Sequence, residues 1–138
     1  MPSIEKILYS SRTFTIGGRE GAGHSEDHRL DVQLTPPGAP GSGTNPEQLF
    51  AVCWSASLLA ALRHACNARK IAFPAIAAIE AQIDLLHGEK GFFLQALIRV
   101  SLPEIDPEMA HRLIEAAYRN CPYSKATRRN IEVDLVLS

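Results

Sequence analysis

The feature that most constrains this chain is the segment from Leu49 to Cys66, which is apolar nearly all round. It follows the stretch Thr44-Asn45-Pro46-Glu47, where Thr and Glu stand three apart as in a capping box and Pro falls in the permitted first turn. This pattern predicts a helix that starts here and is buried on several sides. At 100° per residue, four of its side chains fall within about 60° of one another and share one stripe: Cys53, Ser57, Ala60 and His64.

The segments before this helix predict two strands and a loop. Residues 5–16 are rich in Thr, Ser, Ile, Tyr and Phe and break at the glycine-rich stretch 17–21, which suits a strand entering a turn. Leu30, Val32 and Leu34 alternate with polar residues and indicate a second, half-buried strand. The stretch 36–43, rich in Pro and Gly, is expected to be a loop rather than a domain boundary.

The segments after the helix predict a hairpin, a second helix and a closing strand. Residues 78–86 and 92–102 are typical of two long strands, and a Gly-bearing loop joins them. Asp106 is a helix cap followed by Pro at the first helical position, and the helical spacing continues to about Asn120, where Cys121-Pro122 stops it. Residues 131–137 alternate apolar and polar side chains, apart from Val136, and predict a final strand.

Strands and helices do not alternate regularly along the chain, so a doubly wound parallel sheet is disfavoured and the α+β class is predicted. With 138 residues and 46% apolar content, the chain suits a single domain, residues 1–138, with one core. The long apolar helix and the long strands present much apolar surface for a chain of this length. We therefore expect a homodimer that buries the excess.

Charge and terminal composition limit the classes of partner. The chain has 14 basic and 15 acidic side chains and a formal net charge of -1, so we expect no nucleic-acid or membrane partner. We also expect no membrane span of roughly 18 to 20 apolar residues, and Met1-Pro2-Ser3-Ile4-Glu5-Lys6 lacks the apolar region of a signal peptide. A cytoplasmic location and small-molecule or protein partners are therefore expected.

The three cysteines, Cys53, Cys66 and Cys121, are too few and too widely spaced for a secreted disulfide framework or a zinc knuckle. The five His are scattered without metal-ligand spacing, and no Gly-x-Ser-x-Gly elbow surrounds Ser55 or Ser57. We expect no metal and no bound cofactor. The cysteines are either buried thiols or redox groups.

Four motifs stand in order along the chain: Ile4-Glu5-Lys6-Ile7-Leu8-Tyr9, Gly17-Gly18-Arg19-Glu20-Gly21, Gly43-Thr44-Asn45-Pro46-Glu47-Gln48-Leu49-Phe50-Ala51 and Cys121-Pro122-Tyr123-Ser124-Lys125-Ala126-Thr127-Arg128. They resemble those of the organic hydroperoxide resistance proteins of the OsmC/Ohr family, and the resemblance runs from end to end. The resemblance implies antiparallel-rich sheets around a long buried central helix, in an intertwined homodimer with an active site at the subunit interface. It also implies reduction of organic peroxides to alcohols by a thiol. The resulting disulfide is then reduced by a dithiol, such as a lipoylated protein.

The resemblance also implies site residues, and one of them departs from the family. Cys121 corresponds to the family's resolving cysteine, Arg19 to its arginine and Glu47 to its glutamate, whereas the attacking cysteine falls on Ser57. A guanidinium lowers the pKa of a nearby thiol, and a carboxylate can hold that guanidinium in place. A serine hydroxyl is far harder to ionise and cannot form a disulfide with Cys121, so Ser57 should not reduce peroxides by the family route.

Three explanations of Ser57 remain open. It is an engineered Cys-to-Ser change, or the lineage moved the reactive thiol one helical turn back to Cys53, or peroxidase activity was lost while the fold and pocket were kept. The leading hypothesis is a hydroperoxide reductase-like protein with Ser57 at the nucleophile position. The rivals are a non-catalytic homologue that binds an apolar ligand in the interface pocket and a peroxidase that uses Cys53.

Each of these residues also has a purely structural interpretation. Glu47 completes a capping box, which is compatible with a catalytic role, and Arg19 is an ordinary exposed residue of a glycine-rich turn. Cys53 and Cys66 lie on an apolar helix, where cysteines are most often inert buried thiols. The aromatic residues Phe50, Trp54 and Phe92 are most simply core, although apolar walls would also suit an organic peroxide.

Overall fold

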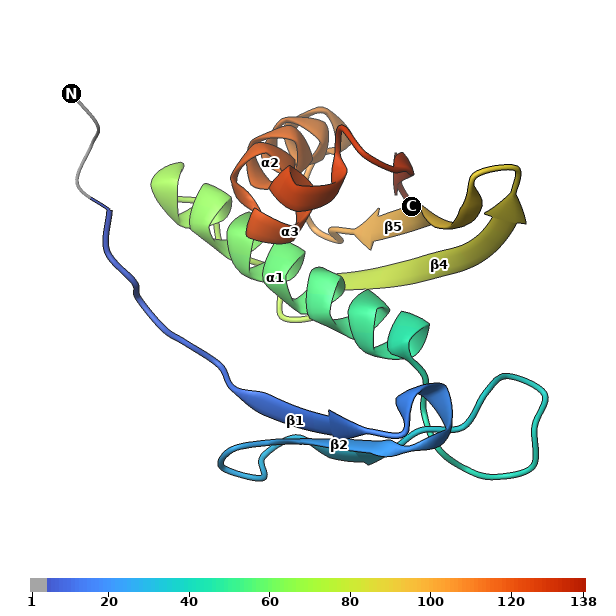
Figure 1. The fold of residues 1–138 in the computed structure, drawn as a ribbon. Helices are drawn as coiled ribbons and strands as arrows, with labels where there is room; N and C mark the ends of the chain where they lie inside the picture. Colours follow the sequence, from blue (N-terminus) through green and yellow to red (C-terminus); the bar gives the residue numbers. More distant parts are fainter. Residues whose placement is uncertain (1–4) are drawn as a thin grey trace. The chain divides into compact units, whose positions relative to one another are not determined.

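The computed structural model describes residues 5–138 (Figure 1). Residues 1–4 lie outside the described residues, and with them the first residue of the N-terminal family motif and most of the segment considered for a signal peptide. The chain forms two compact units, of which the first ends at Pro46 and the second runs from Glu47 to Ser138. The single domain over 1–138 stays a prediction.

The first unit is a three-stranded antiparallel sheet in the order β1-β2-β3. Its strands are Thr13–Ile16, Ala22–Ser25 and Asp31–Gln33. The strand expected over residues 5–16 is thus confined to its last four residues, because β2 supplies pairing partners only from Ala22 to Ser25. Strand β2 was not predicted, since its sequence Ala-Gly-His-Ser lacks the β-branched and aromatic residues that mark a strand. The loop over 36–43 is confirmed.

Glycines shape the turn between β1 and β2, which contains the short 3₁₀ helix η1, Gly18–Glu20. Gly17 and Gly18 have φ angles of 79° and 62°, in the left-handed region that side chains disfavour. A Cβ on Gly21 would lie 1.7 Å from the carbonyl oxygen of Ile16. Arg19 is therefore carried by a backbone conformation that requires glycine around it.

Helix α1, Pro46–Ala68, begins where the Pro in the Thr-Asn-Pro-Glu stretch predicted it. Its buried residues recur at helical spacing and form one stripe, whereas Val52 on another side is 71% exposed. Within the second unit α1 buries one stripe against β5 and α2, and the expected burial of its other sides stays a prediction. That stripe consists of Trp54, Leu58, Leu62, Ala65 and Cys66.

By length and hydropathy alone, α1 could cross a membrane, with 23 residues and a mean hydropathy of 1.4 over its most apolar window. The prediction that no segment is long and apolar enough is therefore corrected. The core helix of a globular protein has the same length and composition. Trp54, Leu58 and Leu62, on one side of α1, pack in the core cluster of the second unit.

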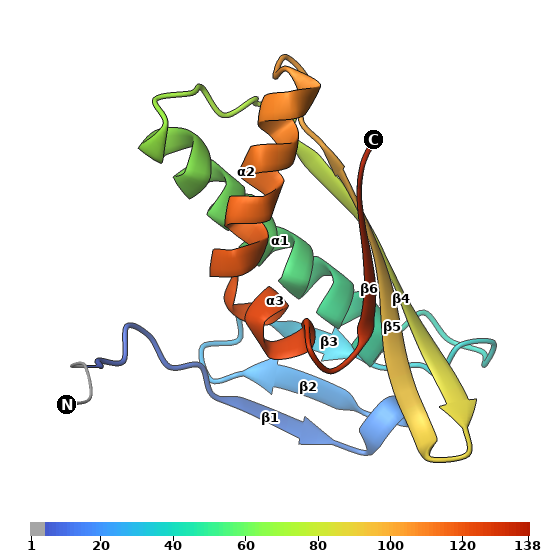
Figure 2. The ribbon, with the colours of Figure 1, turned by 90° about the horizontal axis from the view of Figure 1, so that it is seen from above.

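The second unit contains the sheet β4-β5-β6, with strands Ala78–Gly88, Gly91–Ser101 and Glu132–Leu137. Strands β4 and β5 form the predicted antiparallel hairpin, and β6 lies parallel beside β5 (Figure 2). Parallel neighbours need a crossover connection. Helices α2, Pro107–Asn120, and α3, Pro122–Thr127, form part of it.

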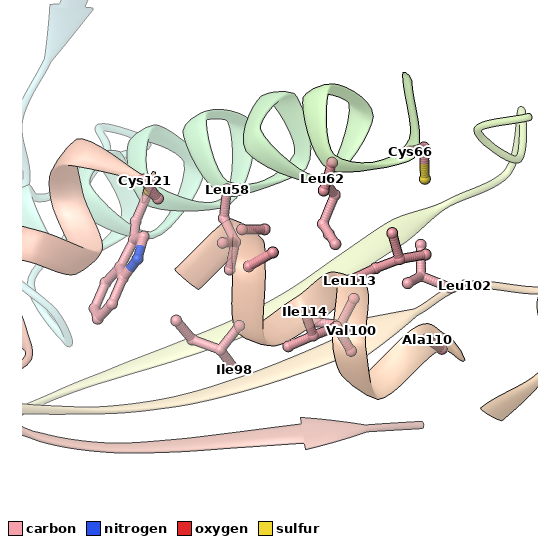
Figure 3. Packing of buried hydrophobic residues seen from close by; sticks show 14 of the residues in the cluster. Leu58, Leu62, Cys66, Ile98, Val100, Leu102, Ala110, Leu113, Ile114 and Cys121 are labelled. Atoms are coloured by element: carbon pink, nitrogen blue, oxygen red, sulfur yellow. The ribbon is translucent and has the colours of Figure 1, made fainter. Parts of the chain in front are cut away.

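The register of this sheet separates an apolar face from a polar one. Ile83, Ala96 and Val133 are neighbours across the three strands, and the adjacent positions on β4 and β5 pair Asp84 with Gln95. The apolar face packs against α1 and α2 in one core cluster. Figure 3 shows side chains from both sides of this contact, with Leu58 and Leu62 from α1 and Ile98 and Val100 from β5.

The N-terminal cap predicted for helix α2 is confirmed. The Asp106 carboxylate accepts hydrogen bonds from the backbone N–H groups of Glu108 and Met109, at 3.1 and 3.3 Å. The helix ends before Cys121 as expected, but α3 follows at once and was not predicted. Pro122 occupies the first position of α3, where its missing N–H is harmless, so the residue that ends α2 also begins α3. The α+β class is confirmed.

Candidate functional site

The corner between α2 and α3 sets the position of Cys121. A proline disfavours helical backbone at the residue before it, and Cys121 accordingly has φ −65° and ψ 124°. Its N–H still donates to the Ala117 carbonyl at 2.8 Å, and its own carbonyl accepts from the Lys125 N–H at 2.9 Å. The residue is thus fixed at both backbone groups, and its side chain is fully buried.

The thiol of Cys121 meets α1 at Ser57. The Cys121 Sγ donates a hydrogen bond to the Ser57 Oγ over 3.5 Å, and the two residues are 64 positions apart in the chain. Ser57 is half-buried. The fold therefore brings together the two positions that the sequence assigned as resolving cysteine and attacking group.

A second contact between α1 and the segment after α2 was missed from the sequence. The indole Nε1–H of Trp54 donates to the Ser124 hydroxyl at 3.0 Å, and both side chains are fully buried. A buried Trp usually finds a partner for its N–H, so an indole on an apolar helix was the available signal for a polar side chain opposite it. This hydrogen bond ties the first turn of α3 to α1.

The surroundings of Cys121 act on its ionisation in two directions. Burial raises the pKa of the Cys121 thiol, but hydrogen bonds with the Ser57 and Ser124 hydroxyls and with backbone groups at Ser124 and Tyr123 outweigh it, so the pKa lies below its ordinary value. When Cys121 ionises, the Ser57 hydroxyl becomes the donor, and hydrogen bonds to a thiolate stabilise the charged form. Cys121 is therefore a buried thiol with enhanced thiolate character.

Cys53 lies one turn before Ser57 on α1 and is half-buried, so the interpretation as an inert buried thiol does not describe it. Its side chain is hydrogen-bonded to the Tyr123 hydroxyl. That bond is the largest cause that raises the pKa of Tyr123, and the charges of Cys53 and Cys121 add to it. The phenol is kept protonated, so Tyr123 acts as a donor toward the sulfur.

Cys66 contrasts with both of these thiols. It is fully buried in the core, and burial raises the pKa of its thiol, although the positive charges of Arg69 and Arg63 oppose this. A thiol that is both buried and hard to ionise is a poor nucleophile. The predicted burial is confirmed for Cys66, and its inertness stays a prediction.

The two charged residues assigned from the family belong to different units. Arg19 lies on η1 in the first unit and is exposed, whereas Glu47 is half-buried in the first turn of α1 in the second unit. A carboxylate at a helix N-terminus is favoured by the helix dipole, which supports the capping interpretation of Glu47 without excluding a catalytic one. The pairing of Arg19 with Glu47 stays a prediction.

The three aromatic residues expected in the core differ in how far they are buried. Trp54 is fully buried, and the half-buried Phe50 ring lies 5.5 Å from it. The expectation is wrong for Phe92, which is 75% exposed, because it stands at the open end of the hairpin against His87.

Within residues 5–138, no group of three or more His, Cys, Asp or Glu side chains is placed to hold a metal ion.

Comparison with known proteins identifies the family. Residues 39–136 match the family model described as OsmC-like protein. The organic hydroperoxide resistance protein of Xanthomonas axonopodis pv. citri is 37% identical over 142 residues, with all of both chains covered.

Two solved structures are also similar. The organic hydroperoxide resistance protein OhrB of Bacillus subtilis has a TM-score of 0.90 and 37% identity, covering 96% of this chain and 100% of that one. An organic hydroperoxide resistance protein from Elizabethkingia anophelis has a TM-score of 0.89 and 35% identity, covering 97% of this chain and 99% of that one. The chain therefore belongs to the OsmC/Ohr family.

Proposed function

We propose that this protein is an organic hydroperoxide reductase-like protein that keeps the resolving thiol and the substrate site, while Ser57 occupies the attacking position. The observation that carries the proposal is the 3.5 Å contact between the Cys121 Sγ and the Ser57 Oγ. A sulfur in place of that oxygen would stand beside Cys121, where a disulfide could form after a small adjustment. Relatives named organic hydroperoxide resistance proteins support the substrate class.

The chemistry of that route depends on an ionised sulfur at position 57. A thiolate attacks one peroxide oxygen, the O–O bond breaks, and the alkoxide takes up a proton and leaves as an alcohol. The second thiol, Cys121, then displaces water from the oxidised sulfur and forms a disulfide. Ser57 closes this route because a hydroxyl ionises far less readily than a thiol and forms no disulfide.

The remaining parts of the site are proposed as the family suggests them. Arg19 would stabilise the thiolate and the leaving oxygen, and Glu47 would hold the guanidinium in place. A homodimer, a cytoplasmic location and a dithiol reductant of the lipoyl type complete the proposal. The exposed apolar residues of the described chain, among them Ile16 and Val52, support a homodimer because such surface is usually covered.

A double variant tests this function independently of Cys53. Cys53→Ala with Ser57→Cys is expected to consume cumene hydroperoxide with dihydrolipoamide as reductant, whereas Cys53→Ala alone is expected to be inert. Cys66→Ala with Ser57→Cys serves as the matched control, because it removes a core thiol outside the site. A double variant that folds and remains inert would remove the basis for a hydroperoxide reductase site.

A second candidate function is non-catalytic binding of an apolar ligand, and Ser57 itself favours it. A hydroxyl keeps the polar contact with Cys121 while it removes the sulfur that would react. Under this alternative the native chain binds 2-phenyl-2-propanol, the unreactive alcohol related to cumene hydroperoxide, and calorimetry detects the heat of binding. The native chain and Cys53→Ala would then bind this alcohol alike, and neither would consume the peroxide.

A further inference from the structure

We infer that Cys53 and Cys121 form a redox pair in the native chain, in which Cys53 attacks an organic hydroperoxide and Cys121 resolves the product. The Tyr123 hydroxyl would supply the proton for the leaving oxygen. The inference rests on the proposed function for its substrate class only. It assigns the attack to a residue one helical turn from the family position.

Access distinguishes Cys53 from the other two cysteines. Cys66 and Cys121 are both fully buried, and Cys53 is the half-buried one of the three. An attacking thiol must meet a peroxide that arrives from solvent, whereas a resolving thiol needs to reach only the oxidised sulfur. The exposures therefore suit Cys53 to the first step and Cys121 to the second.

Two contacts join the same stripe of α1 to the first residues after α2. Ser57 contacts Cys121, and Cys53, four residues earlier, contacts Tyr123. Positions four apart on a helix share a face and lie about 6 Å apart along its axis. Cys53, Ser57, Cys121 and Tyr123 thus form one cluster, in which two thiols flank a serine.

Tyr123 is placed to assist the attack. Its hydroxyl is the hydrogen-bond partner of the Cys53 side chain, and the residue is 41% exposed, so it stands at the border between solvent and the cluster. The same O–H can pass its proton to an oxygen that leaves beside the sulfur.

The reaction begins when the Cys53 thiolate attacks the outer peroxide oxygen, an S–O bond forms, and the O–O bond breaks. The alkoxide takes the Tyr123 proton and leaves as the alcohol, and the phenolate regains a proton from water. The Cys121 thiolate then attacks the sulfenic sulfur, so an S–S bond forms and hydroxide leaves as water. An external dithiol reduces the disulfide and restores both thiols.

Formation of the disulfide requires a local movement. An S–S bond needs the two Cα atoms within about 7 Å, and the Cys121 side chain is directed at Ser57 instead of Cys53. Cys121 must therefore give up its hydrogen bond with Ser57 and turn toward the preceding turn of α1. Cys121 directly precedes the six-residue helix α3, so its first turn would adjust with it.

The experiment treats the native chain with one equivalent of cumene hydroperoxide, blocks free thiols with N-ethylmaleimide and maps the cysteine peptides by mass spectrometry. The expected product is a Cys53–Cys121 disulfide with Cys66 blocked. With dihydrolipoamide present, peroxide consumption should fall to the protein-free rate in Cys53→Ala and remain in Cys66→Ala. Tyr123→Phe should slow the oxidation of Cys53 by about 10²-fold, as expected for loss of a proton donor.

The inference is overturned if Cys53 is recovered blocked by maleimide after peroxide treatment, or if consumption survives in Cys53→Ala. A native chain that is inert while Cys53→Ala with Ser57→Cys is active would remove the inference and leave the proposed function standing. The reverse result, an active native chain that depends on Cys53 beside an inert double variant, would remove the proposed family site and support Cys53.

Discussion

The two sheets of this chain are held in shape by different means. In the second unit, alternate residues of the strands β4, β5 and β6 pack against α1 and α2, and the whole buried core cluster lies there. In the first unit, the strands have three or four residues, and none of its described residues is buried. Its turn is fixed by glycine backbone geometry instead.

This difference matters for the candidate site, because some of its residues belong to the first unit and the others to the second. Cys53, Ser57 and Cys121 are positioned by side-chain packing in the second unit, whereas Arg19 is positioned by the backbone of a turn in the first. Packing defects should therefore disturb the thiol cluster, and glycine substitutions should disturb the arginine. Substitutions made in each unit separately can test this contrast.

The largest effect is expected for Trp54→Ala, which removes a fully buried ring and leaves the Ser124 hydroxyl without its indole donor. The free energy of unfolding should fall by about 3–5 kcal/mol. Urea denaturation measures it, with Lys90→Ala on the exposed turn of the hairpin as control, expected to change stability by about 0.5 kcal/mol or less. Equal losses in the two variants would contradict a core centred on α1.

A smaller effect is expected for Gly21→Ala, because the new Cβ meets the Ile16 carbonyl oxygen. The cost should be about 1–3 kcal/mol and confined to the first unit. Amide hydrogen exchange reports it at the Leu34 N–H, which donates to the Gly21 carbonyl. Gly23→Ala is the matched control, since its nearest neighbour is the Thr15 side chain at 3.3 Å, which can move aside.

The cap of α2 and the hairpin could be predicted from the sequence, because their signals are local. Asp106-Pro107 specifies the start of α2 through its own side chain and ring, and Gly91 with a φ of 98° allows the tight turn before β5. Strand β2 could not be predicted in this way. Its residues become a strand because β1 and β3 pair with them from both sides.

The site was partly predictable for the same reason. The motif around Cys121 and the position of Ser57 follow from the sequence, but the Trp54–Ser124 hydrogen bond joins residues 70 positions apart and depends on how α3 packs. The exposure of Cys53 could not be predicted either. Residues all round α1 are apolar, and only the packed core shows which stripe is covered.

A change in ionisation is expected for Ser57→Ala. The Ser57 hydrogen bond lowers the pKa of the Cys121 thiol, so its removal should raise that pKa and move thiolate formation to higher pH. Ultraviolet titration of the thiolate measures the shift in a chain that also carries Cys53→Ala and Cys66→Ala. A shift to lower pH would show that Ser57 acts on Cys121 in another way.

The smallest effect is expected on the polar face of the second sheet. Hydrogen bonds from Gln95 and Gln82 lower the pKa of Asp84, so the carboxylate stabilises the fold above its unfolded pKa and this stabilisation is lost as the pH falls through the folded pKa. Asp84→Asn should therefore reduce the acid-side slope of stability against pH. Denaturation at a series of acidic pH values checks this, and an unchanged slope would contradict it.

Position 57 stands beside Cys121, and the proposed function requires that this geometry suit thiol chemistry. The direct test is the disulfide state of Cys53→Ala with Ser57→Cys after treatment with cumene hydroperoxide, read by peptide mapping. We expect a disulfide between position 57 and Cys121 that dihydrolipoamide reverses. Recovery of both thiols unlinked after complete reaction with the peroxide would contradict the proposed site.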